Sequence, residues 1–207
     1  MRINALCTKS PRTAKKNCDR VVCCCTAPEE HGFTVVNPFS DDVKLGDIYI
    51  DTLTDEDVLE KACDYLVSTK DAHAIVRAAY DLNETGLIEA RHKLSPIMLL
   101  HKMGVLDKCT IAGGVCLDND DLDLMAQECV PLILLPTAAA GYGYGYAPVC
   151  AALRRGIRVG VGTFDGKYNK TADLDYEIKF LSLTANAEMR AENALSTSQL
   201  NKILAFE

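Results

Sequence analysis

Short apolar runs alternate with amphipathic stretches through most of the second half of the chain. Residues 130–135 read VPLILL and residues 157–162 read IRVGVG, patterns typical of strands buried on both faces. Between them, Pro148 is placed to open a short helix. Strand, helix and strand form a βαβ unit, which predicts parallel strands joined by a right-handed crossover. Because ligands in such folds bind at the carboxyl ends of the strands, a site is expected at residues 136–146 and 163–169.

The same alternation continues toward the amino terminus. An amphipathic helix is predicted over residues 54–69, with Thr54 as its cap. A helix capped by Ser95 and a last helix opened by the capping box of Ser196 and Gln199 are also expected. Helices and strands that alternate in this way indicate an α/β fold with a parallel sheet. The remaining predicted elements are strands over residues 2–7, 21–25, 33–36, 47–50, 74–80 and 109–112, and helices over residues 118–128 and 173–189.

Length and composition are those of an ordinary soluble domain. The 207 residues, 48% hydrophobic and 25% charged, fit one domain, in which residues 1–53 are irregular and β-rich and residues 54–207 form β/α units. The net charge of −7 argues against electrostatic binding to nucleic acid or to a membrane. The chain has neither a membrane-spanning run nor a signal-peptide core, so its ten cysteines favour a reducing, cytoplasmic location.

Neither the cysteines nor the histidines follow a metal-binding pattern. Cys23, Cys24 and Cys25 are consecutive, whereas structural zinc sites use Cys-x-x-Cys pairs and neighbouring residues of a strand point to opposite faces. We interpret these cysteines as small apolar side chains of a buried strand. Surface or capping roles are expected for the four histidines, which are His31, His73, His92 and His101.

The sequence GYGYGY at residues 141–146 is the most unusual stretch. Its glycines give backbone freedom, and its tyrosines supply flat, amphipathic contact surface. Two interpretations stay open. The loop packs its rings on its own surface, or Tyr142, Tyr144 and Tyr146 form a stacking platform for a small planar ligand or a partner. The stretch is not a phosphate-binding loop, because no Lys followed by Ser or Thr comes after the glycines.

A series of short motifs occurs in a defined order between residues 81 and 183. The motifs are DLNET at 81–85, SP at 95–96, GVLD at 104–107, AGGVCLD at 112–118, PTAA at 136–139, APV at 147–149 and GTF at 162–164, followed by Asn169, Asp173 and Glu177. In these motifs and their order, this half of the chain resembles the amidohydrolase superfamily, in its cytosine deaminase, guanine deaminase and chlorohydrolase branch.

The resemblance implies a TIM-type (β/α)8 barrel, of which this chain would supply about strands 4 to 8 as a partial barrel. It also implies a catalytic zinc or iron ion that activates water. The matching ligand positions are Asp81, Gly113 and Phe164, and neither glycine nor phenylalanine can ligate a metal. The histidine pair of the first strand has no counterpart. We therefore expect no metal and no cofactor, and these three positions, with Thr137 and Asn169, are candidate ligand-binding residues.

Two carboxylates keep catalytic interpretations open. Glu84 matches the superfamily's proton-shuttling glutamate, and the alternative is a carboxylate that stabilises the start of a helix. Asp165 follows Phe164 and could replace the lost aspartate through a shift of one residue. A site for Mg²⁺ or Mn²⁺ made of Asp81, Glu84 and Asp165 is a further alternative, because these ions prefer oxygen ligands.

The leading interpretation is a pseudoenzyme: an amidohydrolase-like protein that has lost metal-dependent C–N hydrolysis and acts as a ligand-binding or assembly subunit. One alternative is an active hydrolase of non-peptide C–N bonds, of the deaminase type, that holds zinc or another divalent metal and is completed by a partner chain. Another is a structural fragment without a ligand. A partial barrel exposes strand edges and an apolar interior, so a homo-oligomer or a complementary half-barrel chain is expected as partner.

Overall fold

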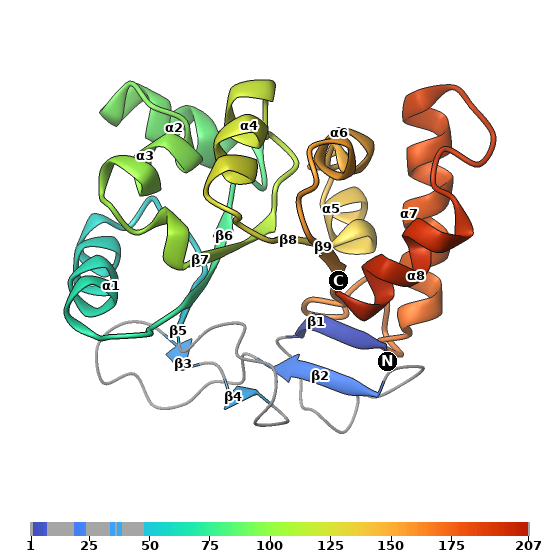
Figure 1. Ribbon diagram of the computed structural model, residues 1–207, viewed down its shortest axis with the longest axis horizontal. Coiled ribbons are helices and arrows are strands. Elements are labelled where there is room, and N and C mark those ends of the chain that lie inside the picture. The colour runs from blue at the N-terminus through green and yellow to red at the C-terminus, as the bar shows by residue number, and fades with distance from the viewer. Residues whose placement is uncertain (1, 8–18, 24–33, 36, 39–47, 207) are drawn as a thin grey trace.

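The computed structural model describes residues 2–7, 19–23, 34–35, 37–38 and 48–206. The strands of these residues form one curled sheet in the order β3-β5-β6-β7-β8-β9-β1-β2-β4 (Figure 1). Their bounds are β1 Ile3–Cys7, β2 Arg20–Cys23, β3 Thr34–Val35, β4 Asn37–Pro38, β5 Ile48–Ile50, β6 Ala74–Ala78, β7 Cys109–Gly113, β8 Leu132–Leu134 and β9 Val159–Val161.

Every neighbouring pair from β5 through β9 and β1 to β2 is parallel. The register sets Val76 of β6 beside Ile111 of β7, and Ile133 of β8 beside Gly160 of β9. The carboxyl ends of these strands therefore meet at one rim of the sheet. This arrangement confirms the predicted α/β fold with a partial barrel of the TIM type.

The amino-terminal strands belong to the same sheet rather than to a separate layer. β1 pairs in parallel with β9, the last strand of the chain. β3 pairs antiparallel with β5, and β4 pairs antiparallel with β2. β3 and β4 are the first and last strands in the sheet order, and one residue of sequence separates them. Both edges of the parallel sheet are thus paired within this chain.

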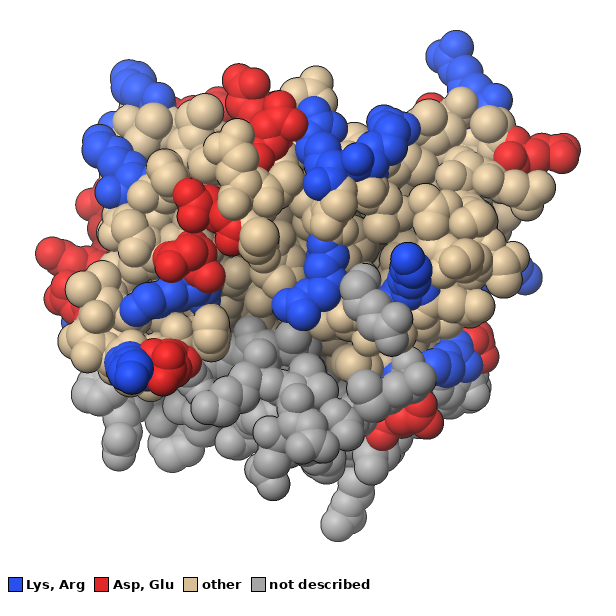
Figure 2. Space-filling model, in the orientation of Figure 1, with Lys and Arg blue, Asp and Glu red and all other residues tan. Residues whose placement is uncertain are grey.

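Helices cover the outer face of the sheet (Figure 1). None of the helices in the described part of the chain is long and apolar enough to cross a membrane. On the face drawn in Figure 2, basic side chains lie among acidic ones. The helices are α1 Glu56–Ser68, α2 Leu82–His92, α3 Pro96–Lys102, η1 Leu106–Lys108, α4 Asn119–Gln127, α5 Pro136–Gly141, α6 Val149–Arg154, α7 Leu174–Met189 and α8 Thr197–Ala205.

Several local predictions are confirmed and others are wrong. Ser95 caps α3, and the capping box of Ser196 opens α8. Thr54 is not the cap of α1, because the Asp55 carboxylate accepts the Val58 amide at 3.2 Å and α1 begins one residue later. Pro148 precedes the first turn of α6 instead of standing in it. Cys24 and Cys25 of the cysteine run lie outside the described residues.

The sheet separates two apolar layers. Alternate strand residues such as Val76 and Val159 pack outward against the helices. The inner face carries Tyr49, Ile75, Ala112 and Ile133, which form a second cluster that also includes Phe206. Arg77 stands two residues after Ile75 in β6, so its side chain faces the same concave side as that cluster.

Candidate functional site

The carboxyl ends of the parallel strands form a small aromatic site, here called the barrel mouth. It surrounds a cavity of about 10 Å³, which has room for about one water molecule. The lining residues that matter below are Arg77, Tyr80, Gly113, Tyr142, Tyr144 and Phe164.

Arg77 is the charged side chain of the barrel mouth. Its Nε donates to the Asp51 carbonyl oxygen at 2.9 Å, and Nη2 donates to the Asp51 carboxylate at 3.2 Å. The guanidinium lies 3.8 Å from the ring centroid of Tyr80 and 5.3 Å from that of Phe164, both cation–π contacts. With 13% of its side chain exposed, Arg77 is a built-in cation at this rim.

Phe164 contributes a ring and a strained backbone. Its φ of +49° is in the left-handed region, where a bulky side chain is an outlier. The Phe164 amide donates to the Leu6 carbonyl at 3.0 Å, a contact between the segment after β9 and strand β1. The conformation is thus fixed where the chain leaves β9, and the aromatic ring reaches the guanidinium of Arg77.

Gly113 ends β7 with a φ of +101°. A β-carbon at this position would lie 2.7 Å from the β-carbon of Tyr80, closer than real side chains approach. No larger residue therefore fits at position 113 unless Tyr80 moves. This position is the second of the three that the resemblance aligns with metal ligands.

Asp81 and Glu84 are held at the start of α2. The Asp81 carboxylate caps the helix and accepts the Glu84 amide at 2.7 Å. Glu84 is 1% exposed, and its carboxylate accepts the amides of Leu53 at 3.3 Å and Tyr80 at 3.4 Å. Burial raises the pKa of Glu84 to about 7, although those amides oppose the shift. Glu84 therefore links the loop after β5 to the loop after β6.

These residues do not fit a catalytic transition metal. Gly113 and Phe164 carry no donor atom, and Asp81 is engaged as a helix cap. Across the described part of the chain, no three His, Cys, Asp or Glu side chains are grouped so that they could hold a metal ion. The suggested carboxylate site of Asp81, Glu84 and Asp165 is therefore not formed. The Arg77 cation, which lines the same cavity as Gly113 and Phe164, further disfavours a second positive charge there.

The tyrosines of residues 141–146 have unequal roles. The rings of Tyr142 and Tyr144 are stacked, with centroids 5.5 Å apart and planes at 18°. Tyr144 also meets Tyr80 edge-on at 5.7 Å, and Tyr142 meets Tyr168 edge-on at 5.0 Å. Tyr146 is 53% exposed and does not line the mouth cavity. The stretch begins in a helix, because Gly141 is the last residue of α5. The prediction of a loop before Tyr142 is therefore wrong.

Asp165 supports the tyrosine stack. Its carboxylate accepts a hydrogen bond from the Tyr142 hydroxyl. It also accepts one from the Lys167 backbone amide at 2.9 Å. The hydrogen bond to Asp165 is the main reason that the pKa of Tyr142 is raised to about 12. The Lys167 ammonium lies 4.5 Å from the Tyr142 ring centroid. Asp165 therefore positions a ring of the mouth.

Thr137 and Asn169 lie in a buried network away from the mouth cavity. The Glu177 carboxylate accepts the Thr137 amide at 3.0 Å, the Thr137 hydroxyl at 2.5 Å and the Asn169 side-chain amide at 2.9 Å. All three residues are at most 5% exposed. Burial raises the pKa of Glu177, against the effect of these hydrogen bonds. The network attaches the start of α5 to α7 and to the loop after β9.

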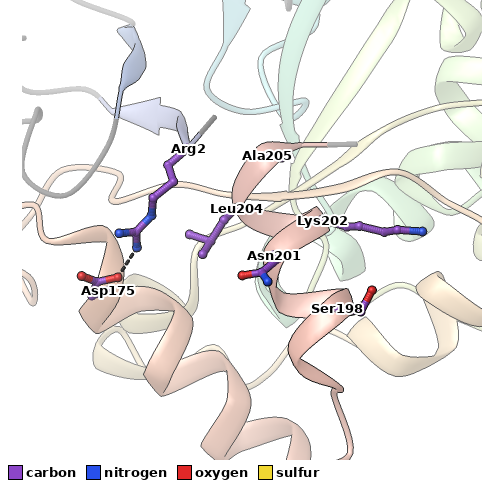
Figure 3. A pocket seen from close by; sticks show the side chains of 7 residues that line it. All are labelled: Arg2, Asp175, Ser198, Asn201, Lys202, Leu204 and Ala205. Carbon is purple, nitrogen blue, oxygen red and sulfur yellow. Dashed lines mark hydrogen bonds and ion pairs between the residues drawn. The ribbon is translucent and has the colours of Figure 1, made fainter.

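A much larger open cavity, of about 830 Å³, lies near the amino end of β1 and beside α8 (Figure 3). Arg2 and Asp175 form an ion pair on one side of it. The side chain of Lys202 extends away from Arg2, so the two cations do not converge on a common point (Figure 3). This cavity therefore lacks the arrangement of an anion site, and the barrel mouth is the better candidate.

Four residues of the site were not predicted from the sequence: Arg77, Tyr80, Lys167 and Tyr168. For Arg77 a signal was present, since it is a charged residue within the otherwise apolar strand AIVRA at positions 74–78. Such a residue points to a function or a buried ion pair. The ring–ring contacts of Tyr80 with Tyr144 and of Tyr168 with Tyr142 join residues more than twenty positions apart, and no local pattern reveals them.

The chain is similar to known enzymes over part of its length. No protein-family model matches the chain. It is 26% identical over 114 residues to a 5-methylthioadenosine/S-adenosylhomocysteine deaminase of Caldicellulosiruptor saccharolyticus, covering 55% of this chain and 27% of that protein. It is 31% identical over 122 residues to an S-triazine hydrolase of Gordonia rubripertincta, covering 58% and 26%. The guanine deaminase of C. acetobutylicum matches its fold with a TM-score of 0.64 and 18% identity, over 72% of this chain and 37% of that one.

The predicted resemblance to the amidohydrolase superfamily is confirmed by these relatives over part of the chain. The chain is thus similar to amidohydrolases, deaminases among them, over about half of its own length. Its matches span about a quarter of the length of the curated relatives.

Proposed function

We propose that this protein has lost metal-dependent C–N hydrolysis and uses its barrel mouth to bind a ligand without hydrolysing it. The observation that carries the proposal is the joint position of Arg77, Gly113 and Phe164 around one cavity. Two ligand positions have no donor atom, and a fixed guanidinium lies between the aromatic rings. Hydrolysis in this superfamily needs a metal that lowers the pKa of bound water, and this set of side chains supplies no ligands for one.

The two candidate catalytic carboxylates support the same proposal. Glu84 accepts two backbone amides and is 1% exposed, so it is engaged in structure rather than presented to a substrate. Asp165 accepts the Tyr142 hydroxyl instead of completing a metal site. A general acid or base has to lie within hydrogen-bond reach of the group whose proton it moves. Catalytic roles for both residues stay predictions.

The pairing of the edge strands bears on whether this chain needs a partner. The expected homo-oligomer or complementary half-barrel chain was argued from exposed strand edges. β3 and β4 pair with the two edge strands β5 and β2, which reduces that need. We therefore propose ligand binding ahead of assembly as the function of this chain, and light scattering of the purified protein tests the second role.

Elemental analysis of the natively purified chain, combined with zinc titration by calorimetry, tests the loss of metal chemistry. We expect no stoichiometric zinc, iron or manganese and no tight zinc binding. Release of ammonia or chloride from adenosine-type, guanine and s-triazine compounds is measured in parallel with a zinc-containing deaminase as control. Near-stoichiometric metal together with turnover would overturn the proposal in favour of an active hydrolase of C–N bonds.

A further inference from the structure

The ring of Tyr144 lies in the barrel mouth against two other aromatic rings, those of Tyr142 and Tyr80. The space that the Tyr144 ring occupies is here called the slot. It lies nearly parallel to the ring of Tyr142 and meets the ring of Tyr80 edge-on. Offset-stacked and edge-to-face pairs are the favourable arrangements of aromatic rings, so both walls suit a planar guest. The free volume that remains is only about 10 Å³. The slot is thus occupied by the chain's own side chain.

Glycines flank this ring on both sides. Gly143 has a φ of +77° and Gly145 a φ of +119°, conformations that favour glycine. A β-carbon on Gly143 would meet nothing within 4 Å, so the chain borders open space there. The Tyr144 amide donates to the Ala139 carbonyl at 2.8 Å, which holds the backbone against α5. Rotation at the two glycines can therefore swing the ring out of the slot while α5 stays in place.

Arg77 places a positive charge beside the slot, which favours an electron-rich ring there. Its guanidinium stacks 3.8 Å from the centroid of Tyr80, which is the edge-on wall of the slot. Burial lowers the pKa of Arg77, but Asp51 and the phenol groups of Tyr49, Tyr80 and Tyr144 raise it above its ordinary value. Arg77 and Tyr144 line the same cavity, so an electron-rich ring in the position of the Tyr144 side chain lies near this cation.

We propose that Tyr144 is a displaceable plug and that its slot binds a planar monocyclic phenol in place of the tyrosine ring. A ring of this size and polarity is what the slot already accommodates. The inference rests on the proposed function, because a mouth without a hydrolytic metal is free to hold an unreacted ligand. Binding then competes with an intramolecular contact, which makes the mouth self-inhibited in the absence of ligand.

The probe is 4-methylphenol, which reproduces the tyrosine side chain as a free molecule. Tyr144→Ala is expected to bind it about tenfold more tightly than the wild-type chain, equivalent to ~1.4 kcal/mol, because the variant has no ring to expel. Calorimetry measures both affinities. Tyr146→Ala is the matched control from the same segment, since Tyr146 is exposed and does not line the mouth cavity, and it should retain wild-type affinity.

The non-planar analogue 4-methylcyclohexanol separates stacking from simple filling of an apolar void. It is expected to bind Tyr144→Ala much more weakly than 4-methylphenol. Equal binding of the two compounds, or no gain in affinity for 4-methylphenol on removal of the Tyr144 ring, overturns the plug.

A measurement on the wild-type chain decides the matter if Tyr144→Ala does not fold. Ring-labelled tyrosine NMR, with Tyr144→Phe used to assign the signal, follows the Tyr144 ring during titration with 4-methylphenol. The signal should move toward those of exposed tyrosines, and an unmoved signal at the solubility limit of the probe counts against displacement.

Metal analysis of the same protein separates the plug from the proposed function. A metal-containing chain that binds the probe contradicts the proposed function alone, and a metal-free chain that does not bind it contradicts the plug alone.

Discussion

Gly113 and Tyr80 are packed so closely that a β-carbon on residue 113 would lie 2.7 Å from the β-carbon of Tyr80. The resemblance aligns residue 113 with a metal-ligating histidine, whereas here Tyr80 fills the space that such a side chain would need. Tyr80 in turn stacks on Arg77, the cation of the barrel mouth. The absence of a ligand at position 113 and the aromatic filling of the mouth are therefore parts of one packing arrangement.

Substitution of Gly113 tests this arrangement. Gly113→Ala should lower the free energy of unfolding by about 2–4 kcal/mol, because it combines a left-handed backbone strain with a clash against Tyr80. Urea denaturation measures the loss. Gly104→Ala is the matched control, since Gly104 has a φ of +72° but open space around its β-carbon position, and about 1–2 kcal/mol is expected for strain alone. Equal losses in the two variants would show that Tyr80 yields without cost.

The order of elements after residue 54 could be predicted because strands such as β8 are buried on both faces and form unbroken apolar runs. The start of helix α2 was indicated only by the helix-start interpretation of Glu84, and its extent could not be predicted, since its buried residues are Glu84 and Ile88 and it has no apolar stripe. The pairing of β1 with β9 had no local signal either. It depends on contacts such as the hydrogen bond from Asn4 Nδ2 to Thr163 Oγ1 at 2.9 Å, between residues 159 positions apart in the sequence.

The candidate site was predicted in outline and not in detail. Motif spacing led to Asp81, Gly113 and Phe164, and two of these line the mouth cavity while Asp81 caps α2. The role of Arg77 could not be derived, because an inward direction is defined only once the register of β6 against β7 is known. Sequence patterns indicate which residues share an element, whereas the mouth is made by four separate segments, at the ends of β6, β7, β8 and β9.

Glu84 should make stability depend on pH. Its pKa is raised from 4.5 to about 7 in the folded protein, so the native state holds the proton more tightly than the unfolded chain does. This contribution is fully present below about pH 4.5 and is lost as pH rises through about 7, with a total change of about 2–4 kcal/mol. The difference in unfolding free energy between the wild-type chain and Glu84→Gln, measured from pH 4 to 8, should follow this slope. A pH-independent difference would contradict the raised pKa.

Glu177 should contribute strongly to stability although it lies outside the mouth. Glu177→Ala leaves the Thr137 amide, the Thr137 hydroxyl and one hydrogen bond of the Asn169 side chain without their acceptor. Unpaired buried donors cost about 1–3 kcal/mol each before relaxation, so a net loss of about 2–4 kcal/mol is expected in urea denaturation. Glu192→Ala, an exposed glutamate just after α7, should change stability by less than about 0.5 kcal/mol. A small effect of Glu177→Ala would mean that water replaces the carboxylate.

Substitution of Arg77 distinguishes two reasons why the mouth would not bind a metal: the lack of metal-ligating atoms, and repulsion by the Arg77 charge. Arg77→Met keeps an apolar side chain in the mouth and removes the cation, and the freed Asp51 carboxylate, 60% exposed, remains hydrated. Loss of the hydrogen bonds and ring contacts should cost about 1–2 kcal/mol in urea denaturation. Arg77→Lys should recover little of this, because an ammonium lacks the planar fork that reaches both Asp51 oxygens.

Zinc titration of Arg77→Met is the sharper readout. Since Gly113 and Phe164 still supply no donor, the variant should bind zinc no better than the wild-type chain. Zinc binding gained by this single change would mean that charge repulsion, and not the set of ligands, keeps metal out of the mouth.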